Sequence, residues 1–158
     1  MDEFRKIEQL MIDIFSRDYQ FALATTNLDD ISNRYVDTYY HEGCFYVVTY
    51  QSSRKICDIL IHNKVALTSR NLYSFQGNAS NMGHPHLTEN QVIREKLIQV
   101  FEKWYFKHNN EADQNMCYMK IELSKGFVHH EGKGYAIDFT NRTFNEFPFI
   151  SSIEYTDE

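Results

Sequence analysis

Two adjacent cations follow two serines in the segment Thr49–Leu60, TYQSSRKICDIL. The residues before them form an apolar run typical of a strand, and those after them have helical spacing, so Arg54 and Lys55 fall in the predicted first turn of a helix. Positive side chains are unfavourable there, because the unpaired backbone N–H groups already make that end of a helix positive. A bound anion would resolve this conflict.

The neighbouring residue types suit a phosphate monoester. Ser52 or Ser53 can cap the helix, and backbone N–H groups, a serine hydroxyl and the Lys55 ammonium can converge on one group of phosphate oxygens. Thr49 offers a second hydroxyl, and Arg34, on an earlier predicted strand, offers a planar guanidinium that matches phosphate geometry. The alternative is a solvated helix start with two ordinary surface cations. Spacing alone leaves both interpretations open.

Strands make up most of the scaffold that must position these residues. Alternating or continuous apolar residues between polar turns predict each strand. Residues 142–150 add an edge strand limited by Pro148. The predicted strands before it cover residues 19–27, 33–43, 44–50, 64–71, 73–82, 117–130 and 135–139.

Apolar residues at helical spacing predict three helices. The first covers residues 3–17 and is amphipathic. The second covers residues 52–63, with Ile56, Ile59 and Leu60 on its buried face. The third is long.

This long helix is predicted from Thr88 to His108, because apolar residues recur at helical spacing throughout the segment. Thr88 and Gln91 fit a capping box at its start. Its inward stripe would consist of Val92, Leu97, Val100, Phe101, Trp104 and Tyr105.

The order of these elements predicts the fold class. Short strands with helices at two or three joints, and few connections long enough for a βαβ unit, are typical of an antiparallel barrel with packed helices. The fold class is therefore α+β. The length of 158 residues suits one domain, which we expect to span residues 1–158 with its barrel core at about residues 20–140.

The formal net charge of −6 argues against two classes of partner. Duplex nucleic acid and anionic membranes both need a broad cationic face, so neither is expected to bind. No apolar run approaches the roughly 18 residues of a membrane span. We expect a cytoplasmic protein.

Cysteine and histidine spacing gives little support for a metal site. The three cysteines, Cys44, Cys57 and Cys117, lie far apart in apolar settings and are predicted to be buried, inert thiols. The histidines lie in pairs, His84 with His86 and His129 with His130. A metal or haem site on them is conceivable, but no cysteine or carboxylate accompanies them at ligand spacing, so no metal site is predicted.

The segment Phe45–Thr68 closely resembles the centre of the pyridoxamine 5′-phosphate oxidase-like family, the FMN-binding split barrels. Both have an apolar strand ending in threonine, a Ser-Arg-Lys or Ser-x-Lys motif, a short helix, an asparagine and a valine-rich strand. A looser resemblance runs from Phe21 to Phe139. It rests on the strand around Arg34, on YSFQGNA, and on GYAIDF, which resembles the last barrel strand of the family.

The resemblance implies a homodimeric, six-stranded split barrel with FMN in a cleft at the dimer interface. It also implies which residues contact the cofactor. The phosphate would be held by Arg34, Ser53, Arg54 and Lys55, the ring would lie along the backbone of Tyr35 and Val36, the ribityl side would be lined by Thr49 and Tyr50, and Gln76 would reach the flavin from the other subunit.

The chain departs from the pyridoxamine 5′-phosphate oxidases proper. No tryptophan- and arginine-containing segment follows Phe139, and the only tryptophan, Trp104, lies in the predicted long helix, so vitamin B6 oxidation is not expected. The long helix is more similar to stress-protein and nitroimidazole-reductase-like members of the family.

The resemblance implies an oxidoreductase that moves electrons from a nicotinamide donor to a small organic acceptor. The alternative is a protein that binds flavin or haem without turnover. No nucleophile elbow, Walker loop or His-Glu-x-x-His motif occurs, and Asp37 and Glu42 are interpreted as solvated carboxylates. No catalytic side chain is therefore predicted, because bound flavin carries the redox chemistry itself.

Overall fold

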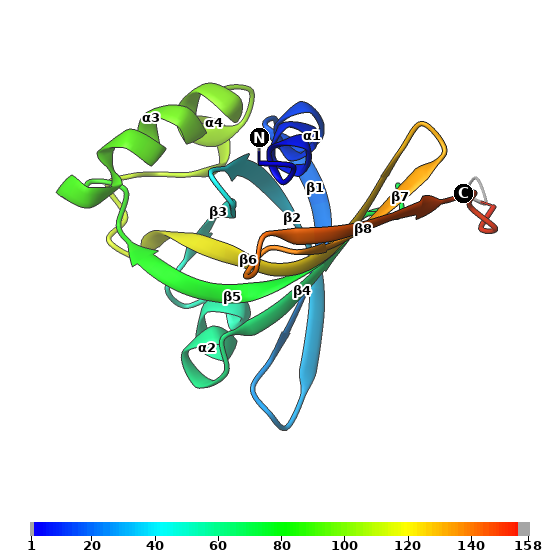
Figure 1. Ribbon diagram of the computed structural model, residues 1–158. Coiled ribbons are helices and arrows are strands. Elements are labelled where there is room, and N and C mark those ends of the chain that lie inside the picture. Colours follow the sequence, from blue (N-terminus) through cyan, green and yellow to red (C-terminus); the bar gives the residue numbers. More distant parts are fainter. Residues whose placement is uncertain (1, 155–158) are drawn as a thin grey trace.

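The computed structural model describes residues 2–154. Within them, eight antiparallel strands form one sheet in the order β3-β2-β1-β4-β5-β6-β7-β8, and an additional pairing of β3 with β6 closes six of the strands into a barrel (Figure 1). The strands are β1 (Tyr19–Thr26), β2 (Ile31–His41), β3 (Cys44–Tyr50), β4 (Lys64–Thr68), β5 (Ser74–Gly83), β6 (Met116–His130), β7 (Lys133–Asp138) and β8 (Thr143–Pro148).

Helices pack around this barrel, which confirms the predicted α+β class and the six-stranded antiparallel barrel. Figure 1 shows α1 and α2 on opposite sides of it. The helices are α1 (Arg5–Phe15), α2 (Arg54–Ile61), the 3₁₀ turn η1 (Thr88–Asn90), α3 (Gln91–Val100) and α4 (Tyr105–His108). No helix in residues 2–154 is both long enough and apolar enough to cross a membrane.

Aromatic rings fill the barrel interior. Phe15, at the end of α1, is fully buried, and its ring meets the edges of Phe45 and Phe75 at centroid distances of 5.4 Å. Edge-to-face pairs of this kind add to the free energy gained from apolar burial. The buried face of α1 thereby joins the inward faces of the strands in one core.

The predicted single helix over residues 88–108 is wrong, because residues 101–104 interrupt it. The interruption lets the Trp104 indole stack on Phe101, with centroids 4.4 Å apart, and donate a hydrogen bond to Asp18 Oδ2 at 2.7 Å. The inward stripe also differs, since Val92 is exposed. The buried residues are Ile93, Leu97, Phe101 and Tyr105.

The predicted capping box at the start of this segment is also wrong. The N-cap of η1 is Leu87, which makes no side-chain cap bond, and Thr88 is the first residue of the turn itself. The buried Asn90 amide instead donates to the carbonyl oxygens of Met82 and His84, at 3.0 and 2.9 Å. Asn90 thereby ties the segment to the end of β5.

Glu111, 9% exposed, anchors the two short helices to the barrel. It accepts two hydrogen bonds from Arg94 of α3, at 2.8 and 2.6 Å, and one from the Tyr105 hydroxyl of α4, at 2.8 Å. The Tyr105 hydroxyl also contacts that of Tyr118 on β6. His86 Nε2 lies 3.2 Å from the same carboxylate.

The predicted role of residues 134–139 as the last barrel strand is wrong. β6 is 15 residues long, and its first part pairs with β3 and β5 while its second part pairs with β7. β6 is therefore the sixth barrel strand. β7 and β8 extend the sheet beyond the barrel (Figure 1), and β8 is the edge strand predicted to end near Pro148.

Gly77→Ala is expected to lower the free energy of unfolding by about 1–2 kcal/mol, because a Cβ at this position overpacks the barrel wall. The added atom would lie 2.5 Å from the backbone oxygen of Glu122 and 3.0 Å from Ile121 Cγ2. Chemical denaturation measures the change. Asn78→Ala, at the exposed neighbouring position, is the control and should stay within about 0.5 kcal/mol of the native protein. Equal effects of the two variants would contradict the close approach.

Candidate anion-binding site

Ser53 caps the helix α2. Its Oγ accepts a hydrogen bond from the backbone N–H of Ile56 at 3.4 Å, and Thr49 Oγ1 donates to the same oxygen at 3.3 Å. The other candidate cap, Ser52, instead exchanges hydrogen bonds with the Asn115 side chain. Ser53 and Thr49 therefore bring two hydroxyl groups to the N-terminus of α2.

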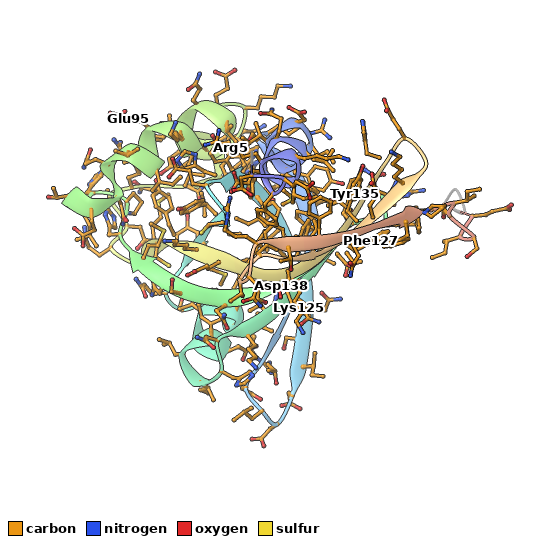
Figure 2. All side chains as sticks on the ribbon, in the orientation of Figure 1. Arg5, Glu95, Lys125, Phe127, Tyr135 and Asp138 are labelled. Atoms are coloured by element: carbon orange, nitrogen blue, oxygen red, sulfur yellow. The ribbon has the colours of Figure 1, made fainter. Side chains whose placement is uncertain are left out.

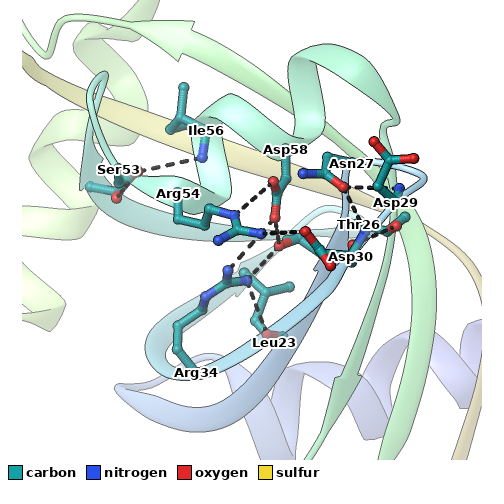
Figure 3. Close-up of polar contacts among 12 residues, drawn as sticks. Leu23, Thr26, Asn27, Asp29, Asp30, Arg34, Ser53, Arg54, Ile56 and Asp58 are labelled. Carbon is teal, nitrogen blue, oxygen red and sulfur yellow. Dashed lines mark hydrogen bonds and ion pairs between the residues drawn. The ribbon is translucent and has the colours of Figure 1, made fainter.

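A buried carboxylate, Asp58, organises the cations around this helix end (Figure 3). Asp58 is 1% exposed and accepts hydrogen bonds from Thr25 Oγ1 at 2.7 Å and from Arg54 Nε at 3.2 Å. An Arg34 guanidinium nitrogen lies 3.9 Å from it. Sequence reasoning missed Asp58, although its position four residues after Arg54 on a helix was a usable signal.

Arg34 reaches this cluster from β2. Its guanidinium donates to Thr25 Oγ1 at 2.7 Å and to the Leu23 carbonyl at 3.2 Å, both on the neighbouring strand β1. Arg34 faces the barrel side of β2, as do the buried side chains of Val36 and Thr38. The sheet therefore fixes the direction in which this guanidinium points.

Arg54, predicted to hold a phosphate, already contacts two carboxylates of the protein. Besides Asp58, it lies 3.9 Å from Asp30, in the turn between β1 and β2 (Figure 3). The Asn27 side chain shapes this turn by accepting hydrogen bonds from the backbone N–H groups of Asp29 and Asp30. Arg54 is 52% exposed at its side chain, so water screens its bond to Asp30.

Lys55 differs from both arginines because no described residue pairs with its charge. The residue is half-buried, and no carboxylate or other acceptor in residues 2–154 pairs with its ammonium. Burial, and then the nearby positive charge of Arg34, lower the pKa of Lys55. A partly buried cation beside another cation is unfavourable unless an anion compensates it.

Of the predicted contact residues, Arg34, Thr49, Ser53, Arg54 and Lys55 gather at this end of α2. The other four lie around or away from the cluster. Tyr35 is 75% exposed on β2, Val36 packs in the core, Tyr50 donates its hydroxyl hydrogen to Asn109, and Gln76 is exposed on β5.

Two predictions about α2 are wrong. Leu60 is exposed, and so is Cys57, because the eight-residue helix buries only the side that carries Ile56, Asp58 and Ile59. Cys44 and Cys117 are buried thiols, as predicted.

Comparison with known proteins finds similarity at the level of structure. No family model matches the chain, and no curated protein matches it. General Stress Protein 26 from Bacillus anthracis str. Sterne matches with a TM-score of 0.58 and 18% identity, over 89% of this chain and 98% of that one. A NimC/NimA family protein from Clostridium acetobutylicum matches with a TM-score of 0.56 and 14% identity, over 89% and 92% of the two chains.

A third solved structure matches this chain over nearly its whole length. It is a pyridoxamine 5′-phosphate oxidase-related, FMN-binding protein from Nostoc punctiforme PCC 73102, with a TM-score of 0.57 and 9% identity over 96% of this chain and 98% of that one. This chain has the split-barrel fold of the pyridoxamine 5′-phosphate oxidase-related proteins. The resemblance found in the sequence is confirmed as a likeness of fold.

His84 and His129, one from each of the two histidine pairs, lie within hydrogen-bonding distance of backbone carbonyl oxygens. His84 Nε2 lies 2.9 Å from the Glu111 carbonyl, and His129 Nε2 lies 2.7 Å from the Asn71 carbonyl. Among residues 2–154, no group of three or more His, Cys, Asp and Glu side chains could hold a metal ion.

Asp58→Asn is expected to destabilise the split barrel by about 1.5 kcal/mol, because hydrogen bonds from charged donors lose their ionised acceptor. The amide NH₂ of asparagine also opposes the Arg54 Nε–H, which needs an acceptor. Thermal unfolding measures the effect. Asp29→Asn, in the exposed turn, is the control. A native-like stability of Asp58→Asn would contradict the organising role of Asp58.

Proposed function

We propose that this protein binds FMN at the N-terminus of α2. The half-buried Lys55 ammonium, which lacks a partner within residues 2–154, carries the proposal. It stands beside the Ser53 cap and the Arg34 guanidinium, and a phosphate monoester supplies the two negative charges that such a group of donors can balance. The FMN-binding description of the Nostoc neighbour supports flavin over other phosphate esters.

Each side chain has a role in this proposal. Ser53, Lys55 and Arg34 hold the phosphate, and Arg54 joins them by exchanging its screened contact with Asp30 for a phosphate oxygen. The backbone of Tyr35 and Val36 lies along the flavin ring, while Thr49 and Tyr50 line the ribityl chain. Gln76 lies on β5, outside the cluster, so we assign it to the flavin of a second subunit, and the functional unit is a homodimer.

The proposed activity is electron transfer from a nicotinamide donor to a small organic acceptor, in the cytoplasm. Bound FMN would supply the redox chemistry, and the protein supplies position and charge. Lys55 and Arg34 neutralise the phosphate, and the barrel wall behind the ring excludes water from one face. No side chain needs to act as a catalytic acid or base.

The absorption spectrum of the purified protein tests the proposal first, before and after FMN is added and the excess removed by gel filtration. Retained flavin bands are expected. Absence of retained flavin would contradict the proposal, and a Soret band would replace flavin with haem. Reduction of the bound flavin by NADH or NADPH, measured against free FMN, then distinguishes an oxidoreductase from a protein that only holds flavin.

Light scattering tests the subunit assignment. A mass near twice 18.8 kDa is expected for the FMN-loaded protein. A monomer that retains FMN would contradict the role given to Gln76, but not the phosphate site at α2.

A further inference from the structure

A second concave site lies on the outer face of the barrel, over β1, β4, β5 and β6. It is a groove of about 550 Å³, a volume in the range of small-molecule sites. Its outward-facing lining includes the small side chains of Ala24 and Ala66, on the neighbouring strands β1 and β4. Cross-strand pairing continues the row from Ala24 through Ala66 to Gln76 and then Lys125.

The apolar part of the groove floor lies on two paired strands. Ala24 and Ala66 are cross-strand partners, and paired strands lie about 4.8 Å apart, so one aromatic ring system can contact both methyl groups. Gly77, which also lines the groove, is buried, and a Cβ there would overlap the Glu122 carbonyl on β6, so it contributes backbone only. A planar ring can therefore rest against the two alanines.

The charge in the groove is the reverse of that of the whole protein. Lys64 and Lys125 border it, and no carboxylate lines it in the described part of the chain, although the net charge of the protein is −6. Within residues 2–154, neither ammonium has a carboxylate within 4.0 Å.

The nearest candidate partner for Lys125 is already engaged. Asp138, which pairs with it across β6 and β7, accepts hydrogen bonds from the backbone N–H and side-chain amide of Asn141, at 3.0 and 2.8 Å. Figure 2 shows Lys125 and Asp138 beside each other at the junction of the barrel and its extension. Hydrogen bonds from Asn141, and to a smaller degree the charge of Lys125, lower the pKa of Asp138. The described residues nevertheless show no Lys125–Asp138 ion pair within 4.0 Å, so the ammonium can still turn to a ligand.

Gln76 supplies the third polar group. Its side-chain amide makes no hydrogen bond to another group in residues 2–154, so both its donor and its acceptor are available. Lys125 is its cross-strand partner, while Lys64 is opposite Asn78, two residues further along β5. The two cations thus flank Gln76 on the surface of the sheet.

We propose that this groove binds an aromatic carboxylate of small-molecule size. The ring stacks on Ala24 and Ala66, the carboxylate lies between Lys64 and Lys125, and the Gln76 amide orients it. Two separated lysines without a helix N-terminus suit a singly charged carboxylate better than a phosphate, which needs converging donors.

The groove also has a place in the proposed flavoprotein. Gln76 is the residue assigned to the flavin of the other subunit, so a carboxylate bound here would lie beside that flavin. This placement rests on the proposed function. The binding of the anion itself rests only on Lys64, Lys125 and the groove floor.

Titration of 2-naphthoate into the full-length protein without added FMN, by isothermal calorimetry at low salt, tests the proposal. The double variant K64Q/K125Q should bind it roughly tenfold more weakly, since two exposed ion pairs are lost. The matched control K103Q/K107Q removes the same charge from exposed positions outside the groove and should bind as the native protein does. Neutral 2-naphthylmethanol should bind the native protein and both variants with equal, lower affinity.

Three outcomes would overturn the proposal. The native protein could fail to bind naphthoate, the two double variants could lose the same naphthoate affinity, or naphthylmethanol could bind as tightly as naphthoate. FMN affinity separates this site from the flavin site, because K64Q/K125Q should retain it. If the native protein binds naphthoate through Lys64 and Lys125 but never retains FMN, the flavin proposal fails and this one stands. If it retains FMN but does not bind naphthoate, the groove proposal fails and the flavin proposal stands.

Discussion

Lys55→Ala is expected to weaken FMN binding by about 1.5–3 kcal/mol, or roughly 10- to 150-fold, the scale of one lost charge-assisted hydrogen bond. Lys55 is half-buried and has no partner in the described chain, so it gives up no existing ion pair when a phosphate binds to it. Fluorescence quenching of FMN on titration with protein measures the affinity.

Arg54→Ala provides the internal comparison. Arg54 already bonds Asp58 and approaches Asp30, so binding a phosphate costs it an existing contact, and its loss should weaken FMN less than the loss of Lys55. Lys103→Ala, at an exposed position in the α3–α4 turn, should have no effect. Unchanged affinity in Lys55→Ala would remove the phosphate site from α2.

The same experiment can be followed against pH. Burial and Arg34 lower the pKa of Lys55, so the ammonium loses its proton at a lower pH than an exposed lysine would. FMN affinity should therefore fall as pH rises through this lowered pKa, and Lys55→Ala should lack that fall.

The second large effect concerns stability. Glu111→Ala is expected to lower the free energy of unfolding by about 3 kcal/mol, because removing the buried carboxylate leaves the partly buried charge of Arg94 uncompensated. Arg94 would lose two hydrogen bonds, and the buried Tyr105 hydroxyl one. Urea denaturation measures the change. Glu102→Ala, an exposed acid in the same region, should stay within about 0.5 kcal/mol of the native protein.

The pH dependence of this stability difference can also be predicted. Hydrogen bonds from Arg94 lower the pKa of Glu111 to about 2, from an ordinary value of 4.5. A carboxyl group whose pKa is lowered in the folded state stabilises the protein fully at any pH above its pKa in the unfolded state. That contribution is lost as pH falls through its pKa in the folded state. The difference between native protein and Glu111→Ala should therefore shrink between about pH 4.5 and pH 2. A constant difference over this range would contradict the ion pair.

Sequence patterns predicted most strands because a strand that buries one face shows alternating apolar residues. They also predicted β3, because this strand is buried on nearly every residue of both faces and is continuously apolar. The long helix was predicted wrongly because its break is not visible in the spacing of its own residues. Its apolar spacing continues through residues 101–104, whereas the interrupted helix goes with a bond from Trp104 to Asp18, a residue far away in the sequence. No local pattern contains that contact.

The site shows the same division. The Ser53 cap and the place of Lys55 in the first turn of α2 could be predicted because helix capping is a property of adjacent residues, whereas their binding of a phosphate stays a prediction. The ties from Arg54 to Asp30 and from Asp58 to Thr25 join α2 to β1 and its turn, so they emerge only when the barrel has folded. The contacts of Tyr35 and Gln76 with flavin stay predictions, because each depends on a molecule outside the chain.

The position of β6 has a consequence for folding kinetics. The barrel closes only when β6 pairs with β3, whose residues lie roughly 70 positions earlier in the chain. Such a distant pairing requires the chain to lose loop-closure entropy before any contact forms. Barrel closure should therefore be the slow step of folding. Until β6 arrives, β3 and β5 expose unpaired strand edges to other chains. A nascent or truncated chain that stops before Met116 should therefore aggregate, whereas the finished chain closes the barrel with its own last barrel strand.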